Sequence, residues 1–159
     1  ASDVYKRQTL FYRWDDRSCF LSSALKLNQE ILFLLEENPT IEKIVLLGHS
    51  YGGILLTWFI ENWTSNTPIE IHTIASPLAG LDSLSNSCNY DPPKQKSKNV
   101  KSVQWRTIKT LDNAFKNLSF DPQLINFKGH EVRNLPDKYK GKRLGHNWSL
   151  SYVADEIIF

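Results

Sequence analysis

The pattern of hydrophobic and polar positions along the chain predicts strands that alternate with helices. Apolar residues recur at helical spacing over 21–37, and Pro39 ends this pattern because proline cannot continue the hydrogen-bond ladder of a helix. The continuous apolar run within 41–47 is typical of a strand that is buried on both faces of a parallel sheet. The other predicted elements are strands at 9–14, 69–75 and 100–108 and helices at 54–63 and 150–158.

This alternation favours the α/β class, with a mostly parallel sheet flanked by helices. The 159 residues suffice for one domain with its own core, which we expect to cover 9–159. The segment 81–101 is polar, lacks periodicity and contains two consecutive prolines, so it is predicted to be a loop or lid inserted between two strands. Residues 1–8 do not fit the pattern, and we expect them to be a non-native tail.

Composition and charge exclude several classes of function. The formal net charge of +2 is too small to indicate a nucleic-acid partner, and the lysines crowded within 94–101 are interpreted as a solvated loop. No apolar run approaches the roughly 18–20 residues of a membrane span. No spacing of Cys and His indicates a metal, and the sequence leaves open whether Cys19 and Cys88 are two thiols or one disulfide. Localisation and oligomeric state also stay open.

The motif Gly48-His49-Ser50-Tyr51-Gly52-Gly53 lies between an apolar run and a helical pattern. A serine on a sharp strand-to-helix turn needs small neighbours, and its hydroxyl lies near the positive end of the helix dipole. The motif resembles the nucleophile elbow of α/β-hydrolases of the lipase and esterase type. The resemblance implies that Ser50 is the nucleophile and that the backbone N–H of Tyr51 is one donor of the oxyanion hole. His49 is interpreted as a packed histidine rather than the base.

The same resemblance implies an acid and a base that follow the nucleophile in that order. His146 follows a glycine and opens the predicted terminal helix, as the base of these enzymes does; His130, which also follows a glycine, is the alternative. Asp112 lies in the loop after the strand 100–108, where the family carries its acid. Asp121 is the alternative acid, and Asp82 is a third.

These residues predict a serine hydrolase that cleaves a carboxylic ester of a small molecule or a lipid through an acyl-enzyme, with no metal and no organic cofactor. The alternatives are an acyltransferase, amidase or thioesterase that uses the same three residues, and a non-catalytic relative that only binds.

The resemblance also implies parts that are missing from this sequence. Hydrolases of this type have further strands before the nucleophile strand, and the second oxyanion N–H comes from a loop among them. We therefore hypothesise that the chain is the C-terminal part of an α/β-hydrolase domain, poorly soluble and weakly active on its own.

Overall fold

The computed structural model describes residues 9–82 and 88–157, so the expected tail at 1–8 lies outside the described residues. From the first helix onward, the order of helices and strands is that of an α/β protein. The elements are α1 (Phe20–Glu37), β1 (Ile44–His49), α2 (Tyr51–Asn62), β2 (Ile69–Ile74), β3 (Val100–Arg106), η1 (Lys109–Leu111), β4 (His130–Asn134), β5 (Lys138–Tyr139), β6 (Lys142–Arg143) and α4 (Trp148–Glu156).

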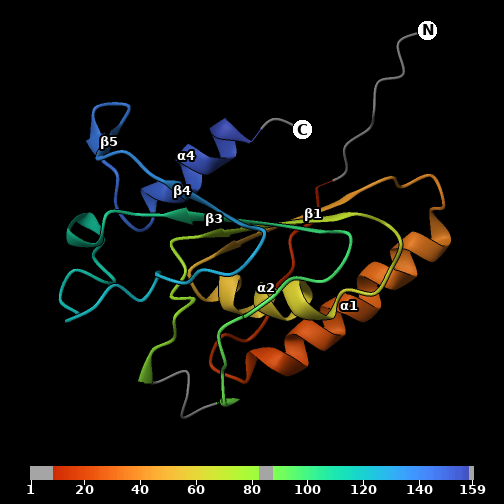
Figure 1. Cartoon of the computed structure of the whole chain (residues 1–159). Coiled ribbons are helices and arrows are strands. Elements are labelled where there is room, and N and C mark those ends of the chain that lie inside the picture. Colours follow the sequence, from red (N-terminus) through yellow and green to blue (C-terminus); the bar gives the residue numbers. More distant parts are fainter. Residues whose placement is uncertain (1–8, 83–87, 158–159) are drawn as a thin grey trace, which may run out of the picture.

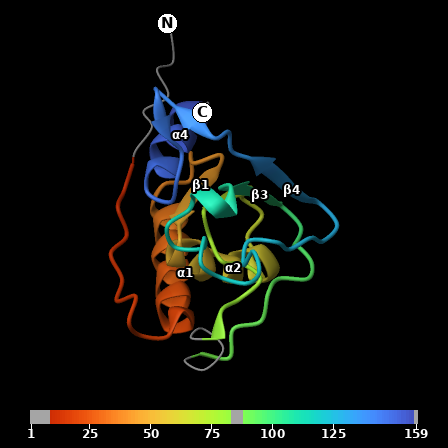
Figure 2. The ribbon, with the colours of Figure 1, turned by 90° about the vertical axis from the view of Figure 1, so that its left-hand side faces the viewer.

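Strands β1 to β4 form an all-parallel sheet in the order β1-β2-β3-β4, while β5 and β6 form a separate antiparallel pair. Helices α1 and α2 cover one face of the sheet and α4 lies on the other (Figure 1). Parallel strands end at the same edge, so the four carboxyl ends meet at the left of Figure 1, which faces the viewer in Figure 2. The predicted α/β class and parallel sheet are confirmed.

The core has two layers because the side chains of a strand alternate between faces. Ile69 and Ile71 of β2 pack with α1 and α2, whereas Ile74 packs with α4 on the opposite face. Phe59 and Ile60 of α2 are fully buried beneath the sheet. The run within 41–47 was predicted to be a strand buried on both faces, and that is wrong: β1 is an end strand, residues 44–46 are only partly buried and Leu47 is 47% exposed.

The predicted strand at 9–14 is wrong. The prediction came from the aromatic and β-branched residues of the segment, and Tyr12 and Trp14 are partly buried against the α1–α2 core while Phe11 is 93% exposed. However, the segment does not pair in the sheet, and the Tyr12 hydroxyl donates to the backbone oxygen of Ser23 in α1. Such a composition favours an extended, half-buried segment, and it does not reveal whether the neighbour is a strand or a helix.

Strand β4 was not predicted. It is short and polar, and it lies at an edge of the sheet, where few side chains are fully buried. Edge strands of this kind carry no apolar run, so hydrophobic periodicity does not find them.

The segment expected as an insertion packs along α2. Tyr90 is buried with Ile54 and Leu78, and its hydroxyl donates to the Leu78 oxygen at 2.8 Å. Ser97 donates its backbone N–H to Ile60 and its hydroxyl to Glu61. The last two residues of the expected range, 100 and 101, belong to β3, and 83–87 lie outside the described residues.

Cys19 and Cys88 form a disulfide, which decides the question that the sequence left open. It joins the residue before α1 to the segment beside α2 and closes a loop with a sequence separation of 69. In the chain-entropy description, a loop of this length stabilises the folded state by about 4 kcal/mol.

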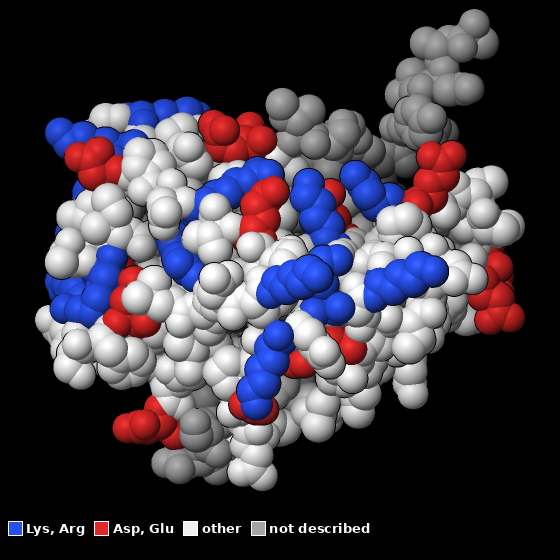
Figure 3. Space-filling model, in the orientation of Figure 1, with Lys and Arg blue, Asp and Glu red and all other residues white. Residues whose placement is uncertain are grey.

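The surface carries charges of both signs. On the face shown in Figure 3, basic groups lie beside acidic ones. The ion pairs of the described residues include Lys94 with Asp91 and Arg133 with Glu131. Lys94, Lys96, Lys98 and Lys101 are exposed, in keeping with a solvated segment. Within residues 9–82 and 88–157, no helix is long and apolar enough to cross a membrane.

We predict that the free edge of β1 drives self-association. β1 is an end strand of the sheet, and Leu47 on it is 47% exposed. Unpaired backbone groups next to exposed apolar side chains template pairing with another chain, and an edge lysine blocks it. Leu47→Lys should therefore raise the monomer fraction and solubility, measured by size-exclusion chromatography with light scattering. Leu124→Lys, at an exposed loop position, is the matched control; an equal gain from that control would contradict the role of the edge.

Candidate active site

Ser50 lies on a strained turn between β1 and α2. Its backbone has φ 54° and ψ −120°, a combination that non-glycine residues rarely adopt. Such strain costs about 1–3 kcal/mol and persists only where the surroundings enforce it. Here the Ser50 N–H donates to the Ile74 oxygen at 2.9 Å, and the Ser50 oxygen accepts from the Gly53 N–H at 3.0 Å. The turn is thus tied to β2 on one side and to α2 on the other.

The turn requires a close approach of backbone at Gly48. A Cβ at this position would lie 2.5 Å from the Gly52 oxygen and 2.8 Å from the Gly53 nitrogen, and both are backbone atoms that cannot move aside. A Cβ on Gly53 would collide with the Ser76 side chain. A Cβ on Gly52 meets nothing within 4 Å, so this glycine of the motif is not required by packing.

Asp112 is a fully buried carboxylate with three donors. Its Oδ2 accepts from the Thr107 hydroxyl at 2.6 Å and from His146 Nδ1 at 3.0 Å, and its Oδ1 accepts from the Ala114 N–H at 2.8 Å. Burial alone would raise the pKa of Asp112, but the hydrogen bonds from His146 and Thr107 outweigh it and hold the pKa below the ordinary value. Asp112 therefore presents a negative charge to His146.

The acid is held by a buried polar frame that the sequence did not reveal. Gln123 Oε1 accepts from the Thr107 N–H at 2.9 Å, and Gln123 Nε2 donates to the Thr107 oxygen at 3.1 Å. This fixes Thr107, whose hydroxyl then points to Asp112. Asp121 accepts from the backbone and side-chain N–H groups of Gln123. The alternative acid therefore serves this frame, and the structure brings Asp112, not Asp121, to a histidine.

His146 lies in the loop between β6 and α4, next to the loop of the acid. The close approach needs Gly145, since a Cβ there would lie 2.7 Å from the Leu111 oxygen. The imidazole meets the ring of Phe115 edge to face, with centroids 5.2 Å apart. Because Nδ1 is bonded to Asp112, Nε2 is the nitrogen left for another partner, and it has no hydrogen bond within the described residues.

The candidate base and the candidate nucleophile lie at the same edge of the sheet. His49, adjacent to Ser50, has its Nε2 2.8 Å from the backbone oxygen of His146, and the two imidazole centroids are 4.8 Å apart. In residues 9–82 and 88–157, no hydrogen bond joins the Ser50 hydroxyl to His146. Contacts of this kind are often long in the unliganded state and tighten only when substrate binds.

His130, the alternative base, has other partners. Its Nδ1 accepts from Ser102 at 3.0 Å and its Nε2 donates to Gln104 at 2.9 Å, while the ring stacks on Phe127. Burial, and secondarily the charge of Arg106, lower the pKa of His130 to about 4. His130 is therefore a neutral member of a polar network between β3 and β4. The third candidate acid, Asp82, is exposed.

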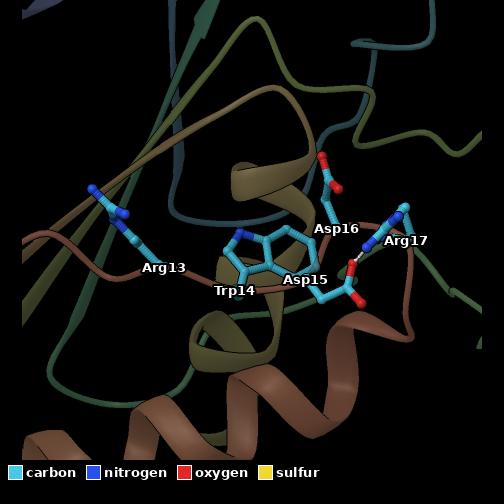
Figure 4. A pocket seen from close by; sticks show the side chains of 5 residues that line it. All are labelled: Arg13, Trp14, Asp15, Asp16 and Arg17. Carbon is cyan, nitrogen blue, oxygen red and sulfur yellow. Dashed lines mark hydrogen bonds and ion pairs between the residues drawn. The ribbon is translucent and has the colours of Figure 1, made fainter.

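Two depressions on the described surface lie away from the candidate site. One open depression of about 600 Å³ is lined by Arg13–Arg17, and Figure 4 shows these side chains spreading from a single segment, with Asp15 and Arg17 paired. A second follows the outer side of α1 beside Phe33. Neither includes a predicted site residue. Within the described ranges, no group of three His, Cys, Asp or Glu residues is arranged to hold a metal ion.

We predict opposite effects for alanine at the two glycines of the turn. Gly48→Ala forces a backbone clash and should lower the free energy of unfolding by about 1–3 kcal/mol or more. Gly52→Ala meets open space within α2 and should raise it by about 0.5–1 kcal/mol. Urea denaturation followed by circular dichroism measures both. Equal stability of the two variants would contradict the close packing at Gly48.

We also predict that stability falls as the solution is acidified from about pH 6.5 to about pH 4. His130 has its ordinary pKa near 6.5 when unfolded and about 4 when folded, so the unfolded state binds more protons in this window. Acid therefore favours unfolding, and the contribution is fully present only above about pH 6.5. His130→Gln should flatten the dependence of the unfolding free energy on pH, measured by urea titrations across the window. An unchanged slope would show that His130 is already protonated in the folded state.

Comparison of the chain with protein-family models, curated proteins and solved structures gives no significant match in any of the three. The fold class stated above rests on the sheet and its helices, and the candidate site rests on the sequence motif together with the Asp112–His146 bond and the turn at Ser50. The likeness to α/β-hydrolases stays a prediction from the motif.

Proposed function

We propose that the chain carries the nucleophile, base and acid of a serine hydrolase of the α/β-hydrolase type. Ser50 is the nucleophile, His146 the general base and Asp112 the orienting acid. The substrate is a carboxylic ester of a small molecule or a lipid, cleaved through an acyl-enzyme. The observation that carries the proposal is the hydrogen bond of 3.0 Å between the buried Asp112 and the partly buried His146, whose backbone oxygen contacts His49, the residue before a serine on a strained turn.

The electrostatics of the pair support these roles. A carboxylate on Nδ1 fixes the tautomer of the imidazole, so that Nε2 is free to accept a proton. It also stabilises the imidazolium that forms when the proton arrives. The pKa of Asp112 is held below its ordinary value, against the effect of burial, by His146 and Thr107, so the carboxylate stays charged near neutral pH.

The reaction follows from these positions. Nε2 of His146 removes the hydroxyl proton as Ser50 Oγ attacks the ester carbonyl, and the carbonyl oxygen becomes an oxyanion. The N–H of Tyr51, the first residue of α2, has no partner inside the helix and is a donor for that oxyanion. His146 then protonates the leaving alcohol. A water that His146 deprotonates next releases the acid and frees Ser50.

The identity of the acyl acceptor is not fixed by these residues. An acyl-enzyme passes its acyl group to water in an esterase and to an alcohol or amine in a transferase, while an amide or thioester substrate uses the same attack. Product analysis with competing alcohols separates these outcomes. A non-catalytic relative would leave Ser50 unreactive.

We predict that the intact chain reacts with a fluorophosphonate probe at Ser50, while Ser50→Ala does not react. Asp112→Asn keeps the shape of the side chain but places an amide against His146 Nδ1, so the labelling rate should fall on the order of 10⁴-fold. Asp121→Asn is the matched control, because an amide oxygen also accepts the two bonds from Gln123, and it should stay within a few-fold of wild type. Mass spectrometry of the labelled peptide gives the site and the rate.

Three results would contradict the proposal. Labelling that survives in Ser50→Ala would place the nucleophile elsewhere. A folded wild-type chain that never reacts with the probe would favour the alternative of a non-catalytic relative that only binds. If Asp121→Asn lowered the labelling rate as much as Asp112→Asn does, the assignment of Asp112 as the acid would be wrong.

A further inference from the structure

His49 ends β1 immediately before Ser50, yet its side chain makes a contact that is distant in sequence. Nε2 of His49 lies 2.8 Å from the backbone oxygen of His146, 97 residues further along the chain. A carbonyl oxygen only accepts hydrogen bonds, so Nε2 carries the hydrogen and donates. The neutral ring of His49 is therefore the Nε2–H tautomer.

The backbone oxygen of His146 is held from two sides. The Ser149 hydroxyl donates to it at 2.5 Å, but Ser149 belongs to α4 and lies only three residues away, so this bond fixes the local conformation of the loop. In residues 9–82 and 88–157, the His49 bond is the one hydrogen bond that ties β1 to this loop. The distance between the base and the turn at Ser50 therefore depends on His49.

The charge of His49 suits this place. Burial lowers the pKa of His49, against the effect of its bond to His146, so the ring is neutral near neutral pH. The charged or titrating groups that act on it are His146 and Asp112. During acyl transfer His146 becomes a cation, and a second cation 4.8 Å away, centroid to centroid, would oppose that step.

We propose, resting on the hydrolase function proposed above, that His49 is a positioning residue whose Nε2–H holds the backbone of His146 where the imidazole reaches Ser50. His49 does not touch the substrate, and it acts through the placement of the base. The sequence motif alone assigns it only to packing. The geometry adds a role to the second residue of the motif, on the strand that also carries the nucleophile.

The test compares two substitutions of His49. His49→Gln keeps an N–H donor at about the same reach, whereas His49→Leu fills the space without a donor. A small displacement of a catalytic group costs up to about 10²-fold in rate. We expect His49→Leu to lower kcat for a chromogenic ester by about 10–100-fold with little change in KM, after normalisation to folded protein. His49→Gln should remain within a few-fold of wild type.

His72→Leu is the matched control. His72 is a buried histidine of β2, bonded to Glu70 and Trp105, and it contacts none of the proposed catalytic residues through a hydrogen bond in the described chain. We expect it to lower stability and leave kcat unchanged. Long-range ¹H–¹⁵N spectra of the wild-type protein should show the Nε2–H tautomer of His49.

The outcomes separate the two proposals. If the wild-type chain reacts with fluorophosphonate and His49→Leu keeps the wild-type kcat, the positioning role is overturned and the hydrolase function stands. An equal loss in His49→Gln and His49→Leu, or an Nδ1–H tautomer of His49, also overturns the positioning role. A folded wild-type chain that never reacts overturns both.

Discussion

The turn at Ser50 is the constraint on which the rest of the candidate site depends. The end strand β1 finishes there and a buried helix begins one residue later, so Ser50 takes a φ of 54° that an ordinary loop would not hold. Two hydrogen bonds enforce this conformation: the Ser50 N–H donates to β2, and the Ser50 oxygen accepts from α2. The absence of a Cβ at Gly48 lets the backbone of α2 approach. Since seven residues of α2 are buried, the core gained by the helix outweighs the local strain.

Asp112 and His146, the proposed acid and base, are fixed by a different kind of interaction. Asp112 is fully buried, and burial raises its pKa and so disfavours the charged form. Three hydrogen-bond donors lower the pKa again and keep the carboxylate charged. Removing one donor from such a group leaves a buried charge short of a partner, which costs more than the bond itself contributes. The frame formed by Thr107 and Gln123 is therefore part of the candidate site, although neither residue is proposed to react.

The sequence predicted the parts of the fold that depend on hydrophobic periodicity. The strands around Ile44 and Ile69 and the helix closed by Pro39 appear with boundaries shifted by a few residues. It failed where an extended segment lies on a helix, at 9–14, and where a polar edge strand forms, at 130–134. The sequence nominated Asp112 and His146 as a pair, and the structure places them in a hydrogen bond of 3.0 Å, while their roles with Ser50 stay a prediction. The Thr107–Gln123 frame and the His49 bond join residues far apart in sequence through single polar atoms, for which no periodic signal exists.

β1 ends at His49, immediately before Ser50, so its carboxyl end must be held in a precise place. It is also an end strand of the sheet. A strand at the edge receives backbone hydrogen bonds from one neighbour only, so it opens locally at lower cost than a central strand does. Precision at its carboxyl end must therefore come from contacts outside the sheet. The bond from His49 to the His146 backbone and the bond from His146 to Asp112 supply two such contacts. Together they join the end of β1 to the loop after β3 and to the start of α4, so the three segments that carry the proposed catalytic groups constrain one another.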